Sequence, residues 1–261
     1  MIRAISCSII NYRAYMLTAQ RKSHLLAALA RTGRVIAAEE AQALGLSEDT
    51  IRRDLRELAA EGKLLRVHGG ALPLSPTHVP LDDRRHMAPG EKRRLGRCAA
   101  ALIRPGQTVI LDGGTTHLAL IDALPRDLAA RIVTHSPVIA AALEPFPNSE
   151  VILIGGRLFR HSMVATGAIA AEAFTRIRAD LCLLGLTGLH PDTGLTTGDD
   201  EEAAIKRRMM DQSGETITLA TSDKIGATSP FRIAALESLT TLITTGPRPG
   251  FLPESTGHIE A

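Results

Sequence analysis

Residues 47–60 place apolar and basic side chains on opposite faces of a predicted helix. At about 100° per residue, Ile51, Leu55 and Leu58 share one face, while the arginines of the segment occupy the other. Ser47 is a candidate N-cap, and the acidic residues directly after it suit the positive end of the helix dipole. The pattern predicts a helix that buries aliphatic side chains in its own domain and offers guanidinium groups to an anionic partner.

Two shorter helices are predicted before this one. The first covers residues 18–32 and carries a stripe of leucines, and the second covers residues 38–44. Only Gly45 and Leu46 separate the second helix from Ser47, and glycine suits the left-handed turn that ends a helix. A helix, a glycine-containing turn and a further helix form a helix-turn-helix. The alternative is a generic helical hairpin whose arginines are solvated.

A basic wing is predicted after the arginine-bearing helix, because residues 63–67 form a short strand that leads into a glycine pair. The second helix of a helix-turn-helix enters the major groove, where Arg52 and Arg53 can pair with base edges. The basic side chains of the predicted strand are candidates for phosphate contacts. The residues predicted to contact double-stranded DNA are Ser47, Asp49, Thr50, Arg52, Arg53, Arg56, Lys63, Arg66, His68 and Gly69.

The charge of the chain supports this assignment. The net charge is only +2, but residues 1–75 contain 11 basic and 7 acidic residues, whereas the remainder is slightly acidic. Aromatic residues make up 3% of the chain, which disfavours single-strand binding through base stacking. One module buries little DNA, so we expect a homo-oligomer, a dimer or a tetramer, on repeated half-sites.

The rest of the chain predicts an α/β domain. Residues 73–90 are rich in Pro, Asp, Arg and His without an apolar period, which is typical of a linker. Residues 91–246 then alternate short apolar runs with helical segments, as in a largely parallel sheet covered by helices. The predicted strands are 108–111, 131–134, 151–154, 181–186, 215–220 and 240–244, and the predicted helices start at 91, 114, 136, 168 and 200. Residues 247–261 are expected to form a tail.

Polar residues follow several of these strands, and ligands of parallel sheets bind at the carboxyl ends of strands. Asp112-Gly113-Gly114-Thr115-Thr116 can cradle a phosphate, because glycines let amides approach an anion closely and threonines add donors. The alternatives are a plain turn for this loop and a solvated ion pair for Glu202 and Lys206. The residues predicted to bind a small effector are Asp112, Gly113, Gly114, Thr115, Thr116, Thr134, Arg157, Thr196, Glu202, Lys206 and Lys224.

Residues 17–71 resemble the N-terminal domain of the DeoR family of bacterial transcriptional regulators. The resemblance is carried by an Arg near the start of the first helix, by Thr50-Ile51-Arg52-Arg53-Asp54-Leu55 three residues after Ser47, and by His68-Gly69-Gly70-Ala71. The segment Glu39-Glu40-Ala41 departs from the family's Glu-Leu-Ala and is expected to lose an aliphatic contact.

Residues 82–245 resemble the effector domain of the same family, which is related in fold to ribose-5-phosphate isomerase. The matching motifs are Glu91-Lys92, the glycine–threonine loop at 112–116, Gly155-Gly156-Arg157, Gly194-Leu195-Thr196-Thr197 and Asp223-Lys224. The resemblance implies a phosphorylated sugar as the effector, with the loop holding phosphate and Lys224 lining the site. Thr187 replaces an Asp of many relatives, and the Pro- and Gly-rich end after Thr245 replaces a final helix and strand.

The fold class predicted for the whole chain is therefore α/β, with an N-terminal winged helix-turn-helix at residues 17–72 and a C-terminal domain that resembles ribose-5-phosphate isomerase. The function predicted is that of a repressor of carbohydrate-metabolism genes that a phosphorylated sugar releases from its operator. The alternatives are an active isomerase with Glu202 as its base, for which the isomerase's Lys-Gly-Gly-Gly loop is missing, and a DNA-packaging protein without sequence preference.

Other functional classes find little support. No metal-ligand spacing or hydrolase motif occurs, so we expect no catalytic residue, metal or cofactor. No apolar run reaches the roughly 18 residues of a membrane span, and three scattered cysteines suit a cytoplasmic protein with reduced thiols. Residues 1–16 are expected to be an extension, either untranslated, with Met16 as the start, or translated and disordered.

Overall fold

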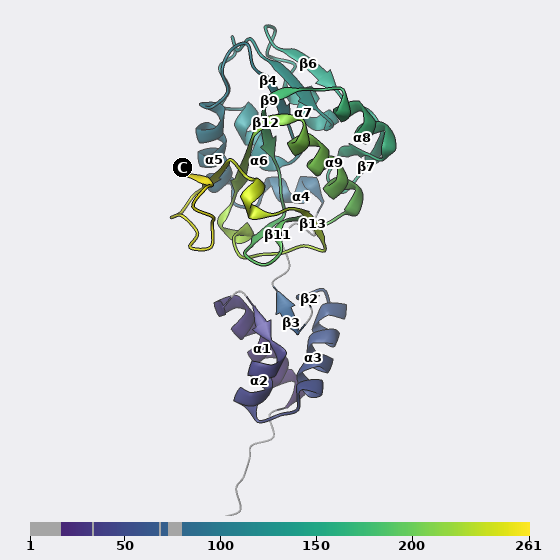
Figure 1. Ribbon diagram of the computed structural model, residues 1–261, viewed down its shortest axis with the longest axis vertical. Coiled ribbons are helices and arrows are strands. Elements are labelled where there is room, and N and C mark those ends of the chain that lie inside the picture. Colours follow the sequence, from purple (N-terminus) through teal and green to yellow (C-terminus); the bar gives the residue numbers. More distant parts are fainter. Residues whose placement is uncertain (1–16, 33, 68, 73–79) are drawn as a thin grey trace, which may run out of the picture. The chain divides into compact units, whose positions relative to one another are not determined.

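The computed structural model describes residues 17–32, 34–67, 69–72 and 80–261 (Figure 1). The described chain divides into two compact units between Ala71 and Leu72, and each unit is described by itself. The expectations for residues 1–16, for His68 and for the first part of the predicted linker lie outside the described residues.

The first unit is a winged helix-turn-helix, as predicted. It contains α1 (Thr18–Thr32), α2 (Ala37–Leu44) and α3 (Glu48–Ala60), with the short strands β1 (Val35–Ile36), β2 (Leu65–Val67) and β3 (Gly70–Leu72) in the order β1-β3-β2. Gly45 ends α2 at φ 64°, and the Ser47 hydroxyl accepts a hydrogen bond from the Thr50 amide at 3.2 Å. Both the predicted turn and the predicted N-cap of α3 are therefore confirmed.

The apolar face of α3 packs where its periodicity places it. Ile51, Leu55 and Leu58 are at most 1% exposed and pack against Leu25 and Leu29 of α1. Burying a side chain of this size contributes about 1.5–3 kcal/mol relative to leaving it exposed. This contact fixes the orientation of α3, and thereby turns its arginines toward solvent.

A buried ion pair also joins α1 to α3. Arg21 donates from Nη2 to Oδ1 of Asp54 at 3.0 Å and from Nε to Oδ2, so the pair is bidentate. Asp54 is fully buried and Arg21 is 6% exposed. The Arg of the first helix and the Asp of the arginine motif thus serve the fold of the unit.

The polar departure in α2 has a partner of its own. Glu40 lies 2.9 Å from Nε2 of His24 on α1, measured from its Oε2. The aliphatic contact expected to be missing under α2 is therefore replaced by a polar contact between the same two helices.

The second unit is built around a parallel sheet. Its described part has seven strands in the order β15-β14-β12-β9-β4-β5-β6, and neighbouring strands pair in parallel. Their bounds are β4 (Thr108–Leu111), β5 (Arg131–Thr134), β6 (Glu150–Leu153), β9 (Ala179–Leu184), β12 (Ser213–Ala220), β14 (Thr241–Thr244) and β15 (Gly257–Glu260). The alternating pattern of strands and helices therefore gives the predicted α/β fold.

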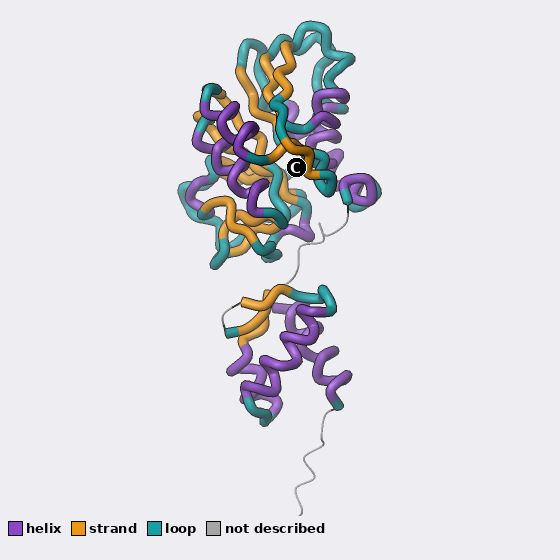
Figure 2. Tube along the Cα trace, turned by 90° about the vertical axis from the view of Figure 1, so that its right-hand side faces the viewer, coloured by secondary structure: helices purple, strands orange, loops and turns teal. Residues whose placement is uncertain are grey.

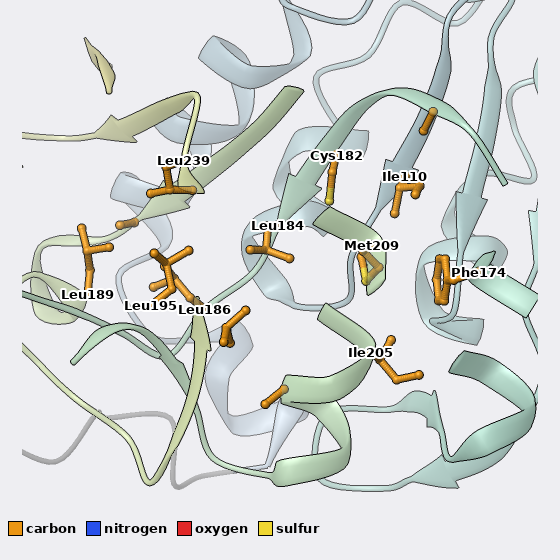
Figure 3. Packing of buried hydrophobic residues seen from close by; sticks show 14 of the residues in the cluster. Ile110, Phe174, Cys182, Leu184, Leu186, Leu189, Leu195, Ile205, Met209 and Leu239 are labelled. Carbon is orange, nitrogen blue, oxygen red and sulfur yellow. The ribbon is translucent and has the colours of Figure 1, made fainter. Parts of the chain in front are cut away.

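Helices cover both faces of this sheet (Figure 2). One face holds α5 (Pro89–Ala100), α6 (Thr115–Ile121) and α7 (Pro137–Ala142), and the other holds α8 (Ala168–Thr175) and α9 (Asp200–Asp211). Successive strand residues point to opposite faces, so Val109 and Leu111 of β4 pack under α5 and α6. Ile110 packs with Phe174 and Met209 on the other face (Figure 3).

Smaller elements lie outside the main sheet. The strands β10 (Gly188–His190), β11 (Gly194–Thr197) and β13 (Phe231–Ala234) form an antiparallel sheet, and β7 (Arg157–Phe159) pairs with β8 (Val164–Thr166). The described residues also include the short 3-10 helices η2 (Ser222–Lys224) and η3 (Leu236–Ser238). These elements are too short for their periodicity to predict them.

Two stretches differ from the predicted layout. The second half of the predicted linker contains α4 (Leu81–Arg85), and α5 begins at Pro89, earlier than the expected start at residue 91. Leu81 is 4% exposed, and its amide donates to the carbonyl of His161 at 3.0 Å. A single buried leucine among charged residues has no helical period, which is why the pattern suggested a linker.

The expected tail is also part of the fold, because β15 extends the sheet beside β14 in parallel register, Thr241 opposite Gly257 and Thr244 opposite Glu260. The Thr244 hydroxyl lies 2.8 Å from Nε2 of His258. The proline- and glycine-rich residues after Thr245 form the connection between β14 and β15. Their composition is therefore that of a long turn and not of a tail.

Candidate functional site

The first unit carries a concave basic surface between α3 and β2. The residues that line it are Asp49, Thr50, Arg52, Arg53, Arg56, Arg66, Val67 and Gly69. Arg53, Arg56 and Arg66 are exposed and form no ion pair with any residue that the structure describes, whereas Arg52 pairs with Glu48 at 2.6 Å. Guanidinium groups without carboxylate partners suit an anionic polymer.

Two of the predicted DNA contacts do not line this surface. The Ser47 hydroxyl is engaged at the start of α3, 2.8 Å from the Thr50 hydroxyl. Lys63 forms an ion pair with Glu61 at 2.8 Å. Ser47 does not line the surface because its side chain caps α3, and Lys63 does not line it because its side chain pairs with Glu61 at the end of α3. His68, the remaining predicted contact, lies outside the described residues.

The second unit contains a cavity of about 60 Å³ at the carboxyl ends of β4, β9 and β12, three neighbouring strands. This is the place where a parallel sheet binds ligands. The residues that line the cavity are Arg84, Met87, Ala88, Lys92, Asp112, Gly113, Gly114, Thr115, Thr116, His117, Ser162, Val164, Gly185, Leu186, Thr187, Thr197, Glu202, Lys206, Leu219, Thr221, Asp223 and Lys224.

The glycine–threonine loop forms one wall of the cavity. Gly114 has φ 119°, a conformation that side chains rarely adopt. A Cβ at Gly113 would lie 2.5 Å from Cγ1 of Val164, and a Cβ at Gly96 of α5 would lie 2.5 Å from the carbonyl of Ala119 on α6. The glycines therefore let the loop pack closely against Val164 of β8 and let α5 pack closely against α6.

Asp112 and Lys206 form a buried ion pair at the base of the cavity. Nζ of Lys206 donates to Oδ2 of Asp112 at 2.5 Å, and the amides of Gly113 and Gly185 each donate to the carboxylate at 2.7 Å. Burial alone raises the pKa of Asp112, but Lys206 and the nearby histidines outweigh it and hold the pKa below its usual value. Asp112 and Lys206 thus neutralise each other.

Three further cationic side chains line the cavity, and none of them has a carboxylate partner like that of Lys206 among the described residues. Arg84, Lys92 and Lys224 form no ion pair within 4.0 Å among the described residues. Burial lowers the pKa of all three side chains, and the neighbouring cations lower the pKa of Lys224 further, to about 8. Asp223 is the acidic residue that opposes this effect at Lys92 and Lys224. We refer to Arg84, Lys92 and Lys224 as the cation cluster.

Glu91 fixes the part of the chain that carries Lys224. Its carboxylate accepts from the amide of Ser222 at 2.8 Å and from the hydroxyls of Ser222 and Thr245, both at 2.9 Å. In the Glu91-Lys92 motif, Lys92 therefore lines the cavity, and Glu91 links α5 to η2 and to the end of β14.

His117 presents a hydrogen-bond acceptor at the cavity. Its Nδ1 lies 3.0 Å from the carbonyl of Gly113, which can only accept, so Nδ1 carries the proton. Burial lowers the pKa of His117 to about 4, which keeps the ring neutral at pH 7. Nε2 is therefore an acceptor, and it has no hydrogen-bond partner in the described part of the chain.

Glu202 lies at the cavity as predicted, but its environment differs from that of a solvated ion pair. It is 6% exposed, and burial raises the pKa of its carboxyl group. The Thr197 hydroxyl donates to Oε2 at 3.4 Å. The alternative interpretation of Glu202 and Lys206 as a surface pair is thus wrong, because both side chains point into the protein.

Three predicted effector residues do not line the cavity. Arg157 is exposed and pairs with Glu201. The Thr134 hydroxyl accepts from the Ser136 amide at 3.1 Å, and Thr196 is 1% exposed, its hydroxyl bonded to Gly188 and Ser229. These threonines serve local turns and the antiparallel sheet, whereas the side chain of Arg157 extends from the β7 hairpin.

The sequence interpretation missed Arg84 and Lys92 as cavity residues. Lys92 stood in the quoted Glu91-Lys92 motif, which was a usable signal. Arg84 lay in the predicted linker, where nothing marked it. Thr187 lines the cavity, but its hydroxyl is bound to the Thr196 carbonyl at 3.1 Å and lies 2.7 Å from the Ser229 hydroxyl.

Comparison with known families accounts for both units. Residues 21–77 match the DeoR-like helix-turn-helix domain, and residues 87–245 match the DeoR C-terminal sensor domain. The chain belongs to the DeoR family. It is therefore a member of a family of DNA-binding transcriptional regulators, and the resemblance seen in the motifs is confirmed.

Several relatives of this DeoR-family protein match over most of their length. The chain is 33% identical to the HTH-type transcriptional regulator GlpR of Haloferax volcanii over 88% of this chain and 91% of that protein. It is 31% identical to the glycerol-3-phosphate regulon repressor of Escherichia coli, over 88% of this chain and 92% of that protein. It is 32% identical to the HTH-type transcriptional repressor GlcR of Bacillus subtilis, over 77% of this chain and 78% of that protein.

Solved structures similar to this chain include ribose 5-phosphate isomerase A of Methanocaldococcus jannaschii, with a TM-score of 0.36 and 13% identity over 51% of this chain and 53% of that one. They also include the sorbitol operon regulator SorC of Klebsiella pneumoniae, with a TM-score of 0.36 and 12% identity over 79% and 90%. The relatives above are regulators, so the isomerase alternative finds no support among them.

The described residues also bear on other classes of function. No described helix is long and apolar enough to cross a membrane. No cluster of three or more His, Cys, Asp or Glu side chains is arranged to hold a metal ion within the same residues.

Proposed function

We propose that the chain is a repressor that binds an operator through α3 and the wing, and that a small phosphorylated sugar or polyol releases it. The observation that carries the effector half is the cation cluster. Arg84, Lys92 and Lys224 are partly or fully desolvated and lack a carboxylate partner within ion-pair distance. Buried charge without a partner is costly, and a phosphate dianion beside the glycine–threonine loop would compensate it.

Other cavity residues suit hydroxyl groups. Nε2 of His117 can accept a hydrogen bond from a hydroxyl, and the carboxyl oxygens of the buried Glu202 can accept one as well. Cations for a phosphate together with acceptors for hydroxyl groups suit a sugar phosphate. The name of the Escherichia coli relative refers to glycerol 3-phosphate, which makes this compound a first candidate.

The ligand is proposed to be bound without turnover. Lys206 is committed to Asp112, and Glu202 is buried and accepts a hydrogen bond from the Thr197 hydroxyl, so neither group is a free base beside the cavity. We also propose a homo-oligomer, since a single helix-turn-helix module contacts one half-site only.

The DNA half is tested by Arg53→Ala, which removes an exposed guanidinium from the centre of the basic surface. A bidentate contact with guanine contributes about 1–3 kcal/mol, so affinity for DNA selected from a random pool should fall roughly 10- to 100-fold. Electrophoretic mobility shift with selected and scrambled duplexes measures this change. Binding to the scrambled duplex at low salt should be largely kept.

The control for that experiment is Arg93→Ala, which removes an exposed arginine of α5 in the other unit. It should bind both duplexes like the wild type. An Arg53→Ala variant that still discriminates the two duplexes as well as the wild type would show that α3 does not read bases.

The effector half predicts a pH dependence. The pKa of Lys224 is about 8, and a bound dianion raises it, so binding takes up protons where the free lysine is neutral. Affinity for glycerol 3-phosphate or another phosphate found by a thermal-shift screen should therefore decline as pH rises above about 8. Lys224→Met should bind more weakly at pH 7 and lose this decline.

Isothermal titration in two buffers of different ionisation enthalpy measures both the affinity and the proton uptake. Arg93→Ala again serves as the control, since it changes the charge of α5 outside the cavity. Wild-type affinity that stays constant from pH 7 to pH 9.5 would contradict the assignment of Lys224 as a phosphate ligand.

A further inference from the structure

Helix α4 is attached to the second unit through one of its own cavity residues. The guanidinium of Arg84 donates from Nη2 to the carbonyl of His161 at 3.1 Å and to the hydroxyl of Ser162 at 3.4 Å. The amide of Leu81 donates to the same carbonyl at 3.0 Å. These contacts place α4 against the loop between β7 and β8.

The backbone of Arg84 is also held by the cavity. Its carbonyl accepts hydrogen bonds from Nζ of Lys92 and, at 3.5 Å, from the hydroxyl of Thr115. Both donors line the cavity, one in the cation cluster and one in the glycine–threonine loop. A phosphate placed there would be a better acceptor for both than a neutral carbonyl, because charged hydrogen bonds are roughly twice as strong as neutral ones.

The side chain of Arg84 has unused hydrogen-bonding capacity. Its Nε is buried and has no partner among the described residues, although the residue lines the cavity. Burial is also the main cause of the lowered pKa of Arg84, and Glu202 opposes it only in part. A buried, unpaired N–H on a cation is a costly feature, and an anion in the cavity would satisfy it.

The junction between α4 and α5 contains a residue in an unusual backbone conformation. Ala88 precedes α5 with φ 45° and ψ 48°, in the left-handed region that residues other than glycine seldom occupy. A strained backbone of this kind persists only while the surrounding contacts hold it. The amide of Lys92 donates to the carbonyl of Ala88 at 3.1 Å, and the amide of Met87 donates to the carbonyl of Arg84 at 3.3 Å.

We propose that Arg84 is a phosphate ligand and that α4 is the element through which the cavity acts on the DNA-binding unit. Anion binding replaces the Arg84 carbonyl as acceptor for Lys92 and Thr115 and engages the Arg84 guanidinium, so α4 exchanges one set of contacts for another. Along the chain, α4 is the first described helix after β3 of the wing. This inference rests on the proposed function and adds to it the route of regulation.

The test compares Arg84→Ala with Arg85→Ala in the full-length protein. Arg85 is the next residue of the same helix, is exposed, and pairs with Asp82 at 3.3 Å outside the cavity. Binding of inorganic phosphate and glycerol 3-phosphate is measured by isothermal titration. Arg84→Ala should weaken binding at least ten-fold, and Arg85→Ala should leave it within two-fold of the wild type.

Amide hydrogen exchange then distinguishes a ligand contact from a purely structural one. Saturating wild type with inorganic phosphate should slow exchange in the α4 peptide, residues 80–88, and the same saturation should leave that peptide unchanged in Arg84→Ala. Arg84→Lys keeps the charge without the Nε donor, so it should recover part of the affinity. Equal phosphate affinity of Arg84→Ala and wild type would overturn the role of Arg84 as a ligand.

The coupling is tested by release of DNA that the protein selects from a random pool. At ligand concentrations that saturate each protein, wild type and Arg85→Ala should release the duplex, and Arg84→Ala should retain it. If saturated Arg84→Ala releases DNA normally, α4 is not the route of regulation. If the wild type itself binds neither anion, both the proposed function and this inference are contradicted. If only Arg84→Ala behaves like the wild type, this inference alone is contradicted.

Discussion

Replacing Lys206 by methionine should destabilise the second unit by about 3–5 kcal/mol at pH 7, the cost of breaking a buried ion pair at one side. Methionine fills a similar volume, but the fully buried carboxylate of Asp112 loses the ammonium at 2.5 Å. The amides of Gly113 and Gly185 remain as donors and keep the loss from being larger. Urea denaturation followed by circular dichroism measures the difference.

The pH dependence of this loss has a definite sign. In the wild type the pKa of Asp112 is lowered, so its contribution to stability is present above the unfolded pKa of about 3.9 and is lost as pH falls through the lower, folded value. Without Lys206 the remaining influence of burial raises the pKa of Asp112. The deficit of the variant should therefore be larger at pH 7 than at pH 5.

A double variant provides the control. Lys206→Met with Asp112→Asn removes both charges and keeps one side-chain oxygen that can accept one of the two backbone hydrogen bonds, so it should recover part of the lost stability. A single variant as stable as the wild type at pH 7 would mean that water reaches Asp112 and that the pair is not buried in solution.

The second large effect is expected in the first unit. Arg21→Met should destabilise that unit by about 3 kcal/mol. This is the low end of the cost of breaking a buried ion pair, because solvent reaches the interior of a small unit more easily. Asp54 stays fully buried without its bidentate partner, and α1 loses its polar link to α3. Small units have little stability to lose, so binding to selected DNA should be strongly reduced at 37 °C.

Limited proteolysis identifies which unit has been affected. Cleavage should increase between residues 17 and 72, and the α/β unit should keep its thermal transition and its phosphate response. Lys22→Met is the matched control, since Lys22 of the same helix pairs with Glu57 and Glu61 at the surface and exposed pairs contribute little. Loss of the α/β transition in Arg21→Met would contradict this interpretation.

The elements that could be predicted are those with a long, regular pattern. The apolar face of α3, its serine cap and Gly45 predicted the helix-turn-helix because each is a local feature. The alternation of strands and helices predicted the parallel sheet, and strand ends predicted the position of the cavity, since carboxyl ends of parallel strands meet at one edge. Gly113 to Thr116 and Lys224 line the cavity for that reason, whereas Glu202 and Lys206 reach it from α9.

Long-range contacts were beyond the reach of periodicity. Arg84 is a cavity residue because Leu81 anchors a five-residue helix to the loop between β7 and β8, far along the chain. Arg157 follows a glycine pair at a strand end, yet Glu201 of α9 holds it at the surface. A motif shows which residues are chemically suited to a site, and the partners contributed by other elements decide which of them reach it.

The short last strand has a consequence for how the protein behaves at high concentration. Leu242 and Ile243 of β14 are fully buried on opposite faces of the sheet, and β15 pairs with the edge of the same strand. Loss or fraying of β15 would leave an apolar four-residue strand with unpaired N–H and C=O groups at the rim of the sheet, and such a rim is a template for strand addition by another chain. Covering the edge of β14 is therefore a consequence of β15 that is independent of DNA and effector binding.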